Sequence, residues 1–146
     1  MKKKYKLSAI NTKEEAIEEA YRYLENAKET LSKIPIEDGI YMDSKFVREA
    51  SGIAYLAPLL AIDGYLIGKG IPKNKLPKST EHYWDVIPKI PYNAKLRNKF
   101  TSVYENLHLF GYYRGGVNVE MIKDGMKHAK EIVDMFKDAA LVISLD

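Results

Sequence analysis

The segment ENLHLFGYYRGG, residues 105–116, combines side chains that could carry chemistry: one histidine, one arginine and several aromatic rings. His108 can accept or donate a proton near neutral pH, and Arg114 can bind a phosphate or a carboxylate. Tyr104 and Tyr112 stand four residues on either side of His108, so a helix would place the three rings in line. The segment therefore holds a candidate polar site, or it is only the end of a helix.

Tyr55 and Asp63 can join this site from an apolar segment of the chain. They are eight residues apart, which is about two helical turns, so they would lie on roughly the same face of a helix. A buried carboxylate is costly unless it is paired, and Asp63 can pair with His108 or with a tyrosine of a facing helix. In the last turn of its own helix, His108 would be favoured in its protonated form by the exposed carbonyls. A hydrogen bond to Asp63 would then be purely structural. Alternatively, Asp63 is an acid with a raised pKa in a binding or proton-transfer site.

The other residue types and spacings argue against a metal centre and against known catalytic motifs. His82, His108 and His128 are widely separated, and the chain has no cysteine. A zinc site needs ligands at closer spacing. The segment GGVNVE lacks the lysine of a phosphate-binding loop, and no nucleophile elbow is present. We therefore predict no metal, no cofactor and no assembled catalytic set.

Positive charge is concentrated in residues 69–99. This segment holds eight lysines or arginines against two acidic residues, a net charge of +6, whereas the whole chain carries +3. Such a segment can attract phosphate, and Lys95, Arg97 and Lys99 are its candidate anion-binding residues. The same composition also suits a solvated connection between helices.

Apolar residues recur at helical spacing in four long segments and one short one. Thr12 and Glu15 form a capping-box pattern before the first segment, and the second is apolar on nearly every side, as is typical of a central helix. Glycines and prolines separate the segments, and no strand pattern competes with them. The sequence thus predicts an all-α, up-and-down bundle of four long helices plus one short helix in the connection. The expected helices are residues 13–33, 44–66, 80–87, 93–109 and 119–137, with Asp43, Ser79 and Asn118 as further capping residues.

The end of the helix that begins near Asn93 decides how the candidate polar site is presented. Gly111 interrupts the helical pattern, and two more glycines follow at positions 115 and 116. We expect this helix to end between Leu109 and Tyr112, with RGG as an exposed corner that leads to the Asn118 cap.

The length is that of a single domain, residues 1–146, with an ordered bundle at about 12–137. A basic arm, residues 1–11, precedes the bundle, and an apolar tail, residues 138–146, follows it. The tail and the eleven tyrosines favour a homo-oligomer, with a dimer as the first choice, or a complex with another protein. The start of the chain has no signal-peptide core, and the longest apolar run is too short to span a membrane. Together with the lack of cysteine, this predicts a cytoplasmic protein without a membrane partner.

Three stretches carry a family resemblance: AIEEAYRYLENAKETL, DGIYMDSKFVREASGIAYLAPLLAIDGYL and VYENLHLFGYYRGGVNVEMIKDGMKHAKEIV. They resemble a bacterial family of small all-α proteins that is a domain of unknown function, and the match covers about residues 14–135. The architecture is similar to that of HEPN domains, which implies four or five helices. HEPN ribonucleases carry an arginine a few residues before a histidine, and none of the three histidines here has one at that spacing. The resemblance therefore implies a HEPN-like bundle without the catalytic Arg/His pair.

The lack of an assembled catalytic set favours a non-enzymatic module that binds itself or another protein. The alternative is a HEPN-like protein that binds nucleotides or RNA, with the basic segment as its footprint. The resemblance implies that such a protein can act as the partner of a nucleotidyltransferase. A further alternative is a degenerate ribonuclease that uses His108 and Arg114.

Overall fold

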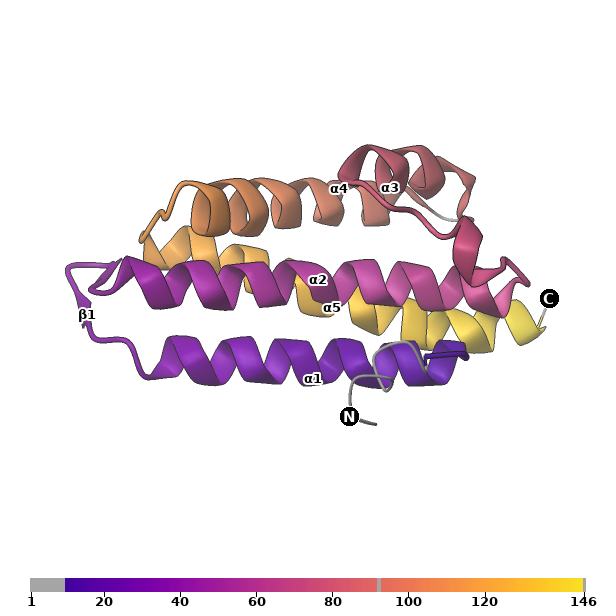
Figure 1. Cartoon of the computed structure of the whole chain (residues 1–146), viewed down its shortest axis with the longest axis horizontal. Helices are drawn as coiled ribbons and strands as arrows, with labels where there is room; N and C mark the ends of the chain where they lie inside the picture. The colour runs from indigo at the N-terminus through magenta and orange to yellow at the C-terminus, as the bar shows by residue number, and fades with distance from the viewer. Residues whose placement is uncertain (1–9, 92, 146) are drawn as a thin grey trace.

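Four long helices run up and down along the molecule, and a short helix lies beside one end of the bundle (Figure 1). The computed structural model describes residues 10–91 and 93–145, with the backbone alone from residue 139 onward. The predicted all-α bundle is confirmed, including the short helix in the connection. The helices are α1 (Lys13–Ser32), α2 (Ser44–Gly68), α3 (Thr80–Val86), α4 (Asn93–Val103) and α5 (Val119–Leu145), with the 3-10 turns η2 (Lys73–Lys75) and η3 (Ile87–Lys89) on either side of α3. Helix α4 continues directly as a π-helix, η4 (Tyr104–Tyr113).

Each predicted capping residue stands at the start of its helix. The Oγ1 atom of Thr12 accepts a hydrogen bond from the Glu15 N–H at 3.1 Å, and the Glu15 carboxylate accepts one from the Thr12 N–H. The side chains of Asp43, Ser79 and Asn118 likewise accept from backbone N–H groups of the first turns of α2, α3 and α5. These N–H groups have no partner inside the helix, so the caps determine where each helix begins.

The central helix is α2, which contacts α1, η4 and α5. It is apolar nearly all round, as the sequence predicts, and its fully buried side chains include Val47, Ala54 and Ile62. By length and composition alone, α2 is long and apolar enough to cross a membrane. Of its most apolar stretch of 18 residues, 56% is buried inside the bundle. The expectation that no apolar run is long enough is therefore wrong on length, because the helix extends past that run on its N-terminal side. The core helix of a soluble protein passes the same test.

A small antiparallel hairpin joins α1 to α2, contrary to the expectation of a chain without strands. Strand β1 (Ile36–Glu37) pairs with β2 (Ile40–Tyr41). Between them, Asp38 and Gly39 have φ angles of 52° and 75°, which is the geometry of a two-residue type I′ turn. Asp-Gly favours this turn because glycine, and aspartate to a lesser degree, tolerates positive φ. The turn signal is therefore in the sequence, but strands of two residues are too short to show an alternating pattern.

Backbone hydrogen bonds tie this hairpin to the turn before α5. The Tyr41 N–H donates to the Val117 carbonyl at 2.9 Å, and the Val119 N–H donates to the Gly39 carbonyl at 3.0 Å. Both turns lie at the same end of the bundle, on the left in Figure 1. The helical hairpin of α1 and α2 is thus joined at this end to the hairpin of α4 and α5.

The last helix is longer than the sequence pattern suggests. Its expected end is near Lys137, whereas α5 runs on to Leu145. The segment AALVISL contains no glycine or proline, so nothing in it stops a helix. Most of the predicted apolar tail is therefore helical backbone. Residue 146 and most of the predicted basic arm, residues 1–9, lie outside the described part of the chain.

Candidate functional site

The candidate polar site lies on η4, where the α-helix widens into a π-helix. In a π-helix each N–H bonds to the carbonyl five residues back instead of four. A hydrogen bond of the same spacing lies at the end of η4, where the Arg114 N–H donates to the Leu109 carbonyl at 2.9 Å. The helix ends at Tyr113, one residue beyond the expected range, because Gly111 packs inside η4 instead of terminating it. Segments of π-helix occur frequently at functional sites.

Gly111 allows η4 to lie close against α2. The residue is buried, and a Cβ atom placed on it would stand 2.2 Å from the Oγ atom of Ser51. The Ser51 hydroxyl is itself fully buried, without a hydrogen-bond partner in the described residues. Gly52 makes a related contact, since a Cβ atom there would meet the Tyr112 ring at 3.0 Å. Small residues on both helices thus hold the rings of η4 directly over α2.

Four rings form an aromatic row along this contact: Trp84, Tyr104, His108 and Tyr112. The His108 ring is nearly parallel to its two neighbours on η4, with centroid distances of 5.4 Å to Tyr104 and 6.1 Å to Tyr112. It also stacks on Tyr55 of α2 at 4.6 Å. Trp84 of α3 meets Tyr104 edge-on at 6.3 Å. Four of the six predicted polar-site residues are therefore brought together as a stack of rings: Tyr55, Tyr104, His108 and Tyr112.

His108 serves in this stack as an aromatic ring. It makes no hydrogen bond in the part of the chain that the structure describes. Burial lowers the pKa of His108, because the charged imidazolium would lose its hydration. Burial therefore acts against the protonated form expected at the helix end. A neutral histidine packed between tyrosines is poorly suited to binding a phosphate.

Asp63 does not pair with His108. The hydroxyl of Tyr83, on α3, donates instead to Oδ1 of Asp63 at 2.9 Å. His108 stacks on Tyr55, and Asp63 lies eight residues further along α2, about 12 Å away along the helix axis. Burial raises the pKa of Asp63 to about 6, and the hydrogen bond from Tyr83 partly opposes that rise. Burial and then the charge of Asp63 raise the pKa of Tyr83 in turn.

Two residues of α3 complete this part of the site, and neither was among the predicted residues. Besides Tyr83, Thr80 places its hydroxyl 3.0 Å from the hydroxyl of Tyr55. The sequence indicates a short helix here from its Ser79 cap. The side that this helix turns toward α2 depends on how the connection folds back, which no local pattern encodes.

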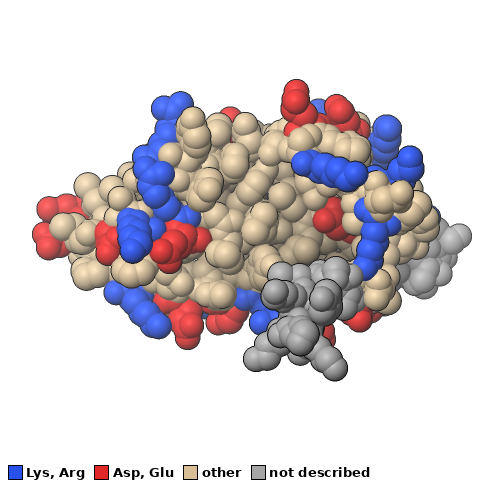
Figure 2. Space-filling view, in the orientation of Figure 1, with Lys and Arg blue, Asp and Glu red and all other residues tan. Residues whose placement is uncertain are grey.

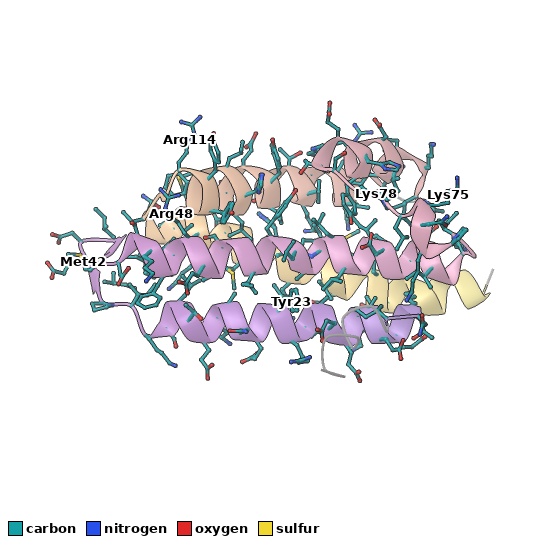
Figure 3. All side chains as sticks on the ribbon, viewed as in Figure 1. Tyr23, Met42, Arg48, Lys75, Lys78 and Arg114 are labelled. Carbon is teal, nitrogen blue, oxygen red and sulfur yellow. The ribbon has the colours of Figure 1, made fainter. Side chains whose placement is uncertain are left out.

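Arg114 lies apart from the aromatic row. Its side chain is exposed and points away from the bundle at the end of η4 (Figure 3). Arg48 of α2 occupies the position beside the helix end, where its Nη1 atom donates to the carbonyls of Tyr112 and Tyr113 at 2.9 and 3.0 Å. Gly115 leaves room for this guanidinium, because a Cβ atom there would stand 2.6 Å from Arg48 Nη2. Carbonyls at a helix end need an outside donor, but the sequence does not show which residue supplies it.

The three candidate anion-binding residues do not form one site. Lys95 and Lys99 line a cavity of about 640 Å³ between α4 and α5, while Arg97 is exposed outside it. Three carboxylates of α5 line the same cavity, and the Nζ atom of Lys99 lies 2.7 Å from Oε1 of Glu131. Carboxylates thus balance the lysines and weaken the attraction for an anion. Within residues 10–91 and 93–145, no group of three or more metal-ligating side chains is gathered in one place.

Comparison with known proteins gives a family and a structural neighbour. Residues 15–138 match the family model described as "Domain of unknown function (DUF5618)". A solved structure, a "protein of unknown function from Dyadobacter fermentans", shares 40% sequence identity with this chain at a TM-score of 0.75. That match covers 88% of this chain and 98% of the other. No curated protein matches the chain. Neither match names an activity, so the function has to be argued from the geometry.

Proposed function

The chain belongs to the family described as Domain of unknown function (DUF5618), and we propose that it is a non-enzymatic interaction module that pairs with a second copy of itself. The observation that carries the proposal is an uncharged strip on the outward side of the central helix α2. The candidate polar site gives little reason to favour an enzyme, since His108 is held in a stack of rings and Asp63 is engaged by Tyr83.

The uncharged strip consists of Gly52, Leu56 and Leu60, which are four residues apart and therefore lie on one side of α2. Leu56 is 41% exposed. Along α2, no charged residue occurs between Glu49 and Asp63. Figure 2 shows a broad area without charged residues over the middle of the molecule, with charged residues gathered toward its two ends. Contiguous uncharged surface of this kind is typical of interaction sites.

A second copy fits the uncharged strip because the strip exposes the apolar side chain of Leu56 at its middle. Two α2 helices packed antiparallel about a two-fold axis near Ala54 would bring Leu56 of each copy against the strip of the other. The ring of Tyr112 covers Gly52, and Tyr83 engages Asp63, so the contact between the copies would be apolar and centred on Leu56.

Light scattering coupled to size-exclusion chromatography tests this pairing. We expect the mass of a dimer for the wild-type protein at micromolar concentration. Leu56→Glu should give a monomer, because it would bury two like charges near the axis. Met42→Glu is the matched control, since Met42 is 52% exposed but lies on the hairpin end of the bundle (Figure 3), and it should remain a dimer. A monomeric wild type, or a Leu56→Glu variant that still pairs, would contradict the proposal.

A HEPN-like protein that binds nucleotides or RNA, alone or as the partner of a nucleotidyltransferase, is the second candidate. Its support is the exposed lysines in the connection after α2, where Lys75 and Lys78 lie at one end of the bundle (Figure 3). Binding through these charges would weaken steeply as salt rises. Fluorescence anisotropy with labelled RNA, on the wild type and a Lys75→Glu/Lys78→Glu variant, tests this candidate. A flat curve at low salt would exclude it.

The degenerate ribonuclease has less support than either of these functions. It would need Arg114 and His108 to hold one phosphate together. Arg114 points away from the bundle, and no hydrogen bond joins it to His108 in the described part of the chain. The lack of cysteine suits a reducing compartment, and we propose the cytoplasm as the location of the protein.

A further inference from the structure

A cavity of about 550 Å³ lies between α1 and α5, away from the aromatic row and from the uncharged strip. Its floor is apolar and is formed by Leu24, Leu31, Ile34 and Met126. The first three of these side chains belong to the packed core, so the cavity reaches down to the interior of the bundle. Its volume falls within the range of about 300–1,000 Å³ that is usual for small-ligand pockets.

The charged residues that line this cavity are four lysines, on both helices, and one carboxylate, that of Glu25 on α1. Lys28 stands on α1, and Lys123, Lys127 and Lys130 recur at spacings of four and three along one side of α5. Lys130 is paired with Asp134 at 3.0 Å, whereas no ion pair joins the other three lysines to a carboxylate in the described residues. Neighbouring like charges on one helix repel, so an anion held at this rim would relieve the repulsion.

The cavity has one closed end and one open end. At the closed end, the Tyr21 hydroxyl of α1 donates a hydrogen bond to Asp134 of α5. The opposite end lies beside the hairpin, where Ile36 is 49% exposed. Along α1 the lining runs from Tyr21 to Ser32, about 16 Å. The shape is that of an apolar trough with a basic rim.

We propose that this cavity binds a single-chain amphiphile with a carboxylate head, namely a free fatty acid. The hydrocarbon chain would lie on the apolar floor, and the carboxylate would sit among the unpaired lysines of the rim. An acidic amphipathic helix is the competing occupant. The cavity volume is in the range of small-ligand pockets, whereas an amphipathic helix is usually bound in a long open groove. The size of the cavity therefore favours the small amphiphile, and the proposal does not depend on pairing through the uncharged strip.

Isothermal titration calorimetry below the micelle concentration tests the head and the tail separately. The probes are dodecanoate, dodecyltrimethylammonium, which has the same tail and a cationic head, and hexanoate, which has the same head and a short tail. We expect dodecanoate to bind, and the other two to bind more weakly by about tenfold or more, because one loses the charge attraction and the other the apolar contact.

Paired variants of the protein locate the binding. Lys28→Glu with Lys127→Glu should weaken dodecanoate binding by about tenfold. Lys75→Glu with Lys89→Glu changes the net charge equally at a distant place and should leave binding unchanged. Met126→Trp should weaken binding, because the larger ring occupies part of the apolar floor, whereas Met126→Leu keeps the volume and should retain binding. Thermal unfolding of each variant confirms that it is folded.

Three results would overturn the proposal. The first is a wild-type protein that does not bind dodecanoate, including the case in which an acidic amphipathic peptide binds instead. The second is dodecyltrimethylammonium binding as tightly as dodecanoate. The third is a folded Met126→Trp variant that binds dodecanoate as well as the wild type does, because the ligand would then lie elsewhere.

Discussion

Replacing Gly111 by alanine should destabilise the protein, although alanine is the better helix former. Helix preference alone would favour the alanine by about 1 kcal/mol. The added Cβ atom, however, would stand 2.2 Å from Ser51 Oγ, 2.7 Å from Ser51 Cβ and 2.9 Å from Ile122 Cδ1. Ser51 sits directly on the α2 backbone, so it cannot move away as the end of a long side chain would. Overpacking of this kind costs about 1–3 kcal/mol, so after the gain in helix preference we expect a net loss of about 1 kcal/mol.

Urea unfolding followed by far-ultraviolet circular dichroism measures this loss. Gly68→Ala is the matched control, because a Cβ atom there meets its nearest neighbour, Lys13 Cβ, at an ordinary 3.6 Å. That variant should be as stable as the wild type or slightly more stable. Adding Ser51→Gly to Gly111→Ala makes room for the new methyl group and should recover part of the loss. A Gly111→Ala protein as stable as the wild type would refute the close approach of η4 to α2, as would the lack of any recovery.

Three further predictions concern the groups around this contact. The pKa of Asp63 is raised from 3.8 to about 6, so the folded protein holds this proton more tightly, and its stability should fall by about 2 kcal/mol as pH rises from about 4 to 6. Asp63→Asn should remove this dependence in denaturant titrations across that range. Arg48→Ala leaves two terminal carbonyls of η4 without their donor and should cost about 1 kcal/mol, with faster hydrogen exchange at the end of η4 that Arg48→Lys restores only in part. The pKa of His108 is lowered from 6.5, so its own contribution to stability should decline as pH falls below about 6.5, opposite in sign to that of Asp63; His108→Phe keeps the stack, and the difference in unfolding free energy between wild type and this variant at pH 5 to 7 isolates the decline.

The helix starts could be predicted because their causes are local. Thr12, Asp43, Ser79 and Asn118 each act on backbone groups within their own first turn, so the residue type and its position are enough. The all-apolar central helix could be predicted for a similar reason, since its composition alone requires burial on every side.

The site was only partly predictable because its contacts join distant segments. The line of Tyr104, His108 and Tyr112 follows from their spacing on one helix. The partner of Asp63 depends instead on the path of the connection, which brings Tyr83 back onto α2. The π-helix depends on the fit of Gly111 against Ser51 of α2. The local sequence around Gly111 predicts a helix end, whereas the contact with Ser51 places this glycine inside the helix.

The main-chain bonds between the hairpin and the turn before α5 hold the end of the bundle that lies opposite the covalent connection between the two helical hairpins. They join Tyr41 to Val117 and Gly39 to Val119, and together with the covalent connection at the opposite end they close the chain into a ring. Sliding of one helical hairpin along the other would break these bonds. At the other end, hydrogen bonds of Thr80 and Tyr83 hold the connection on α2, so the two helical hairpins are joined at both ends.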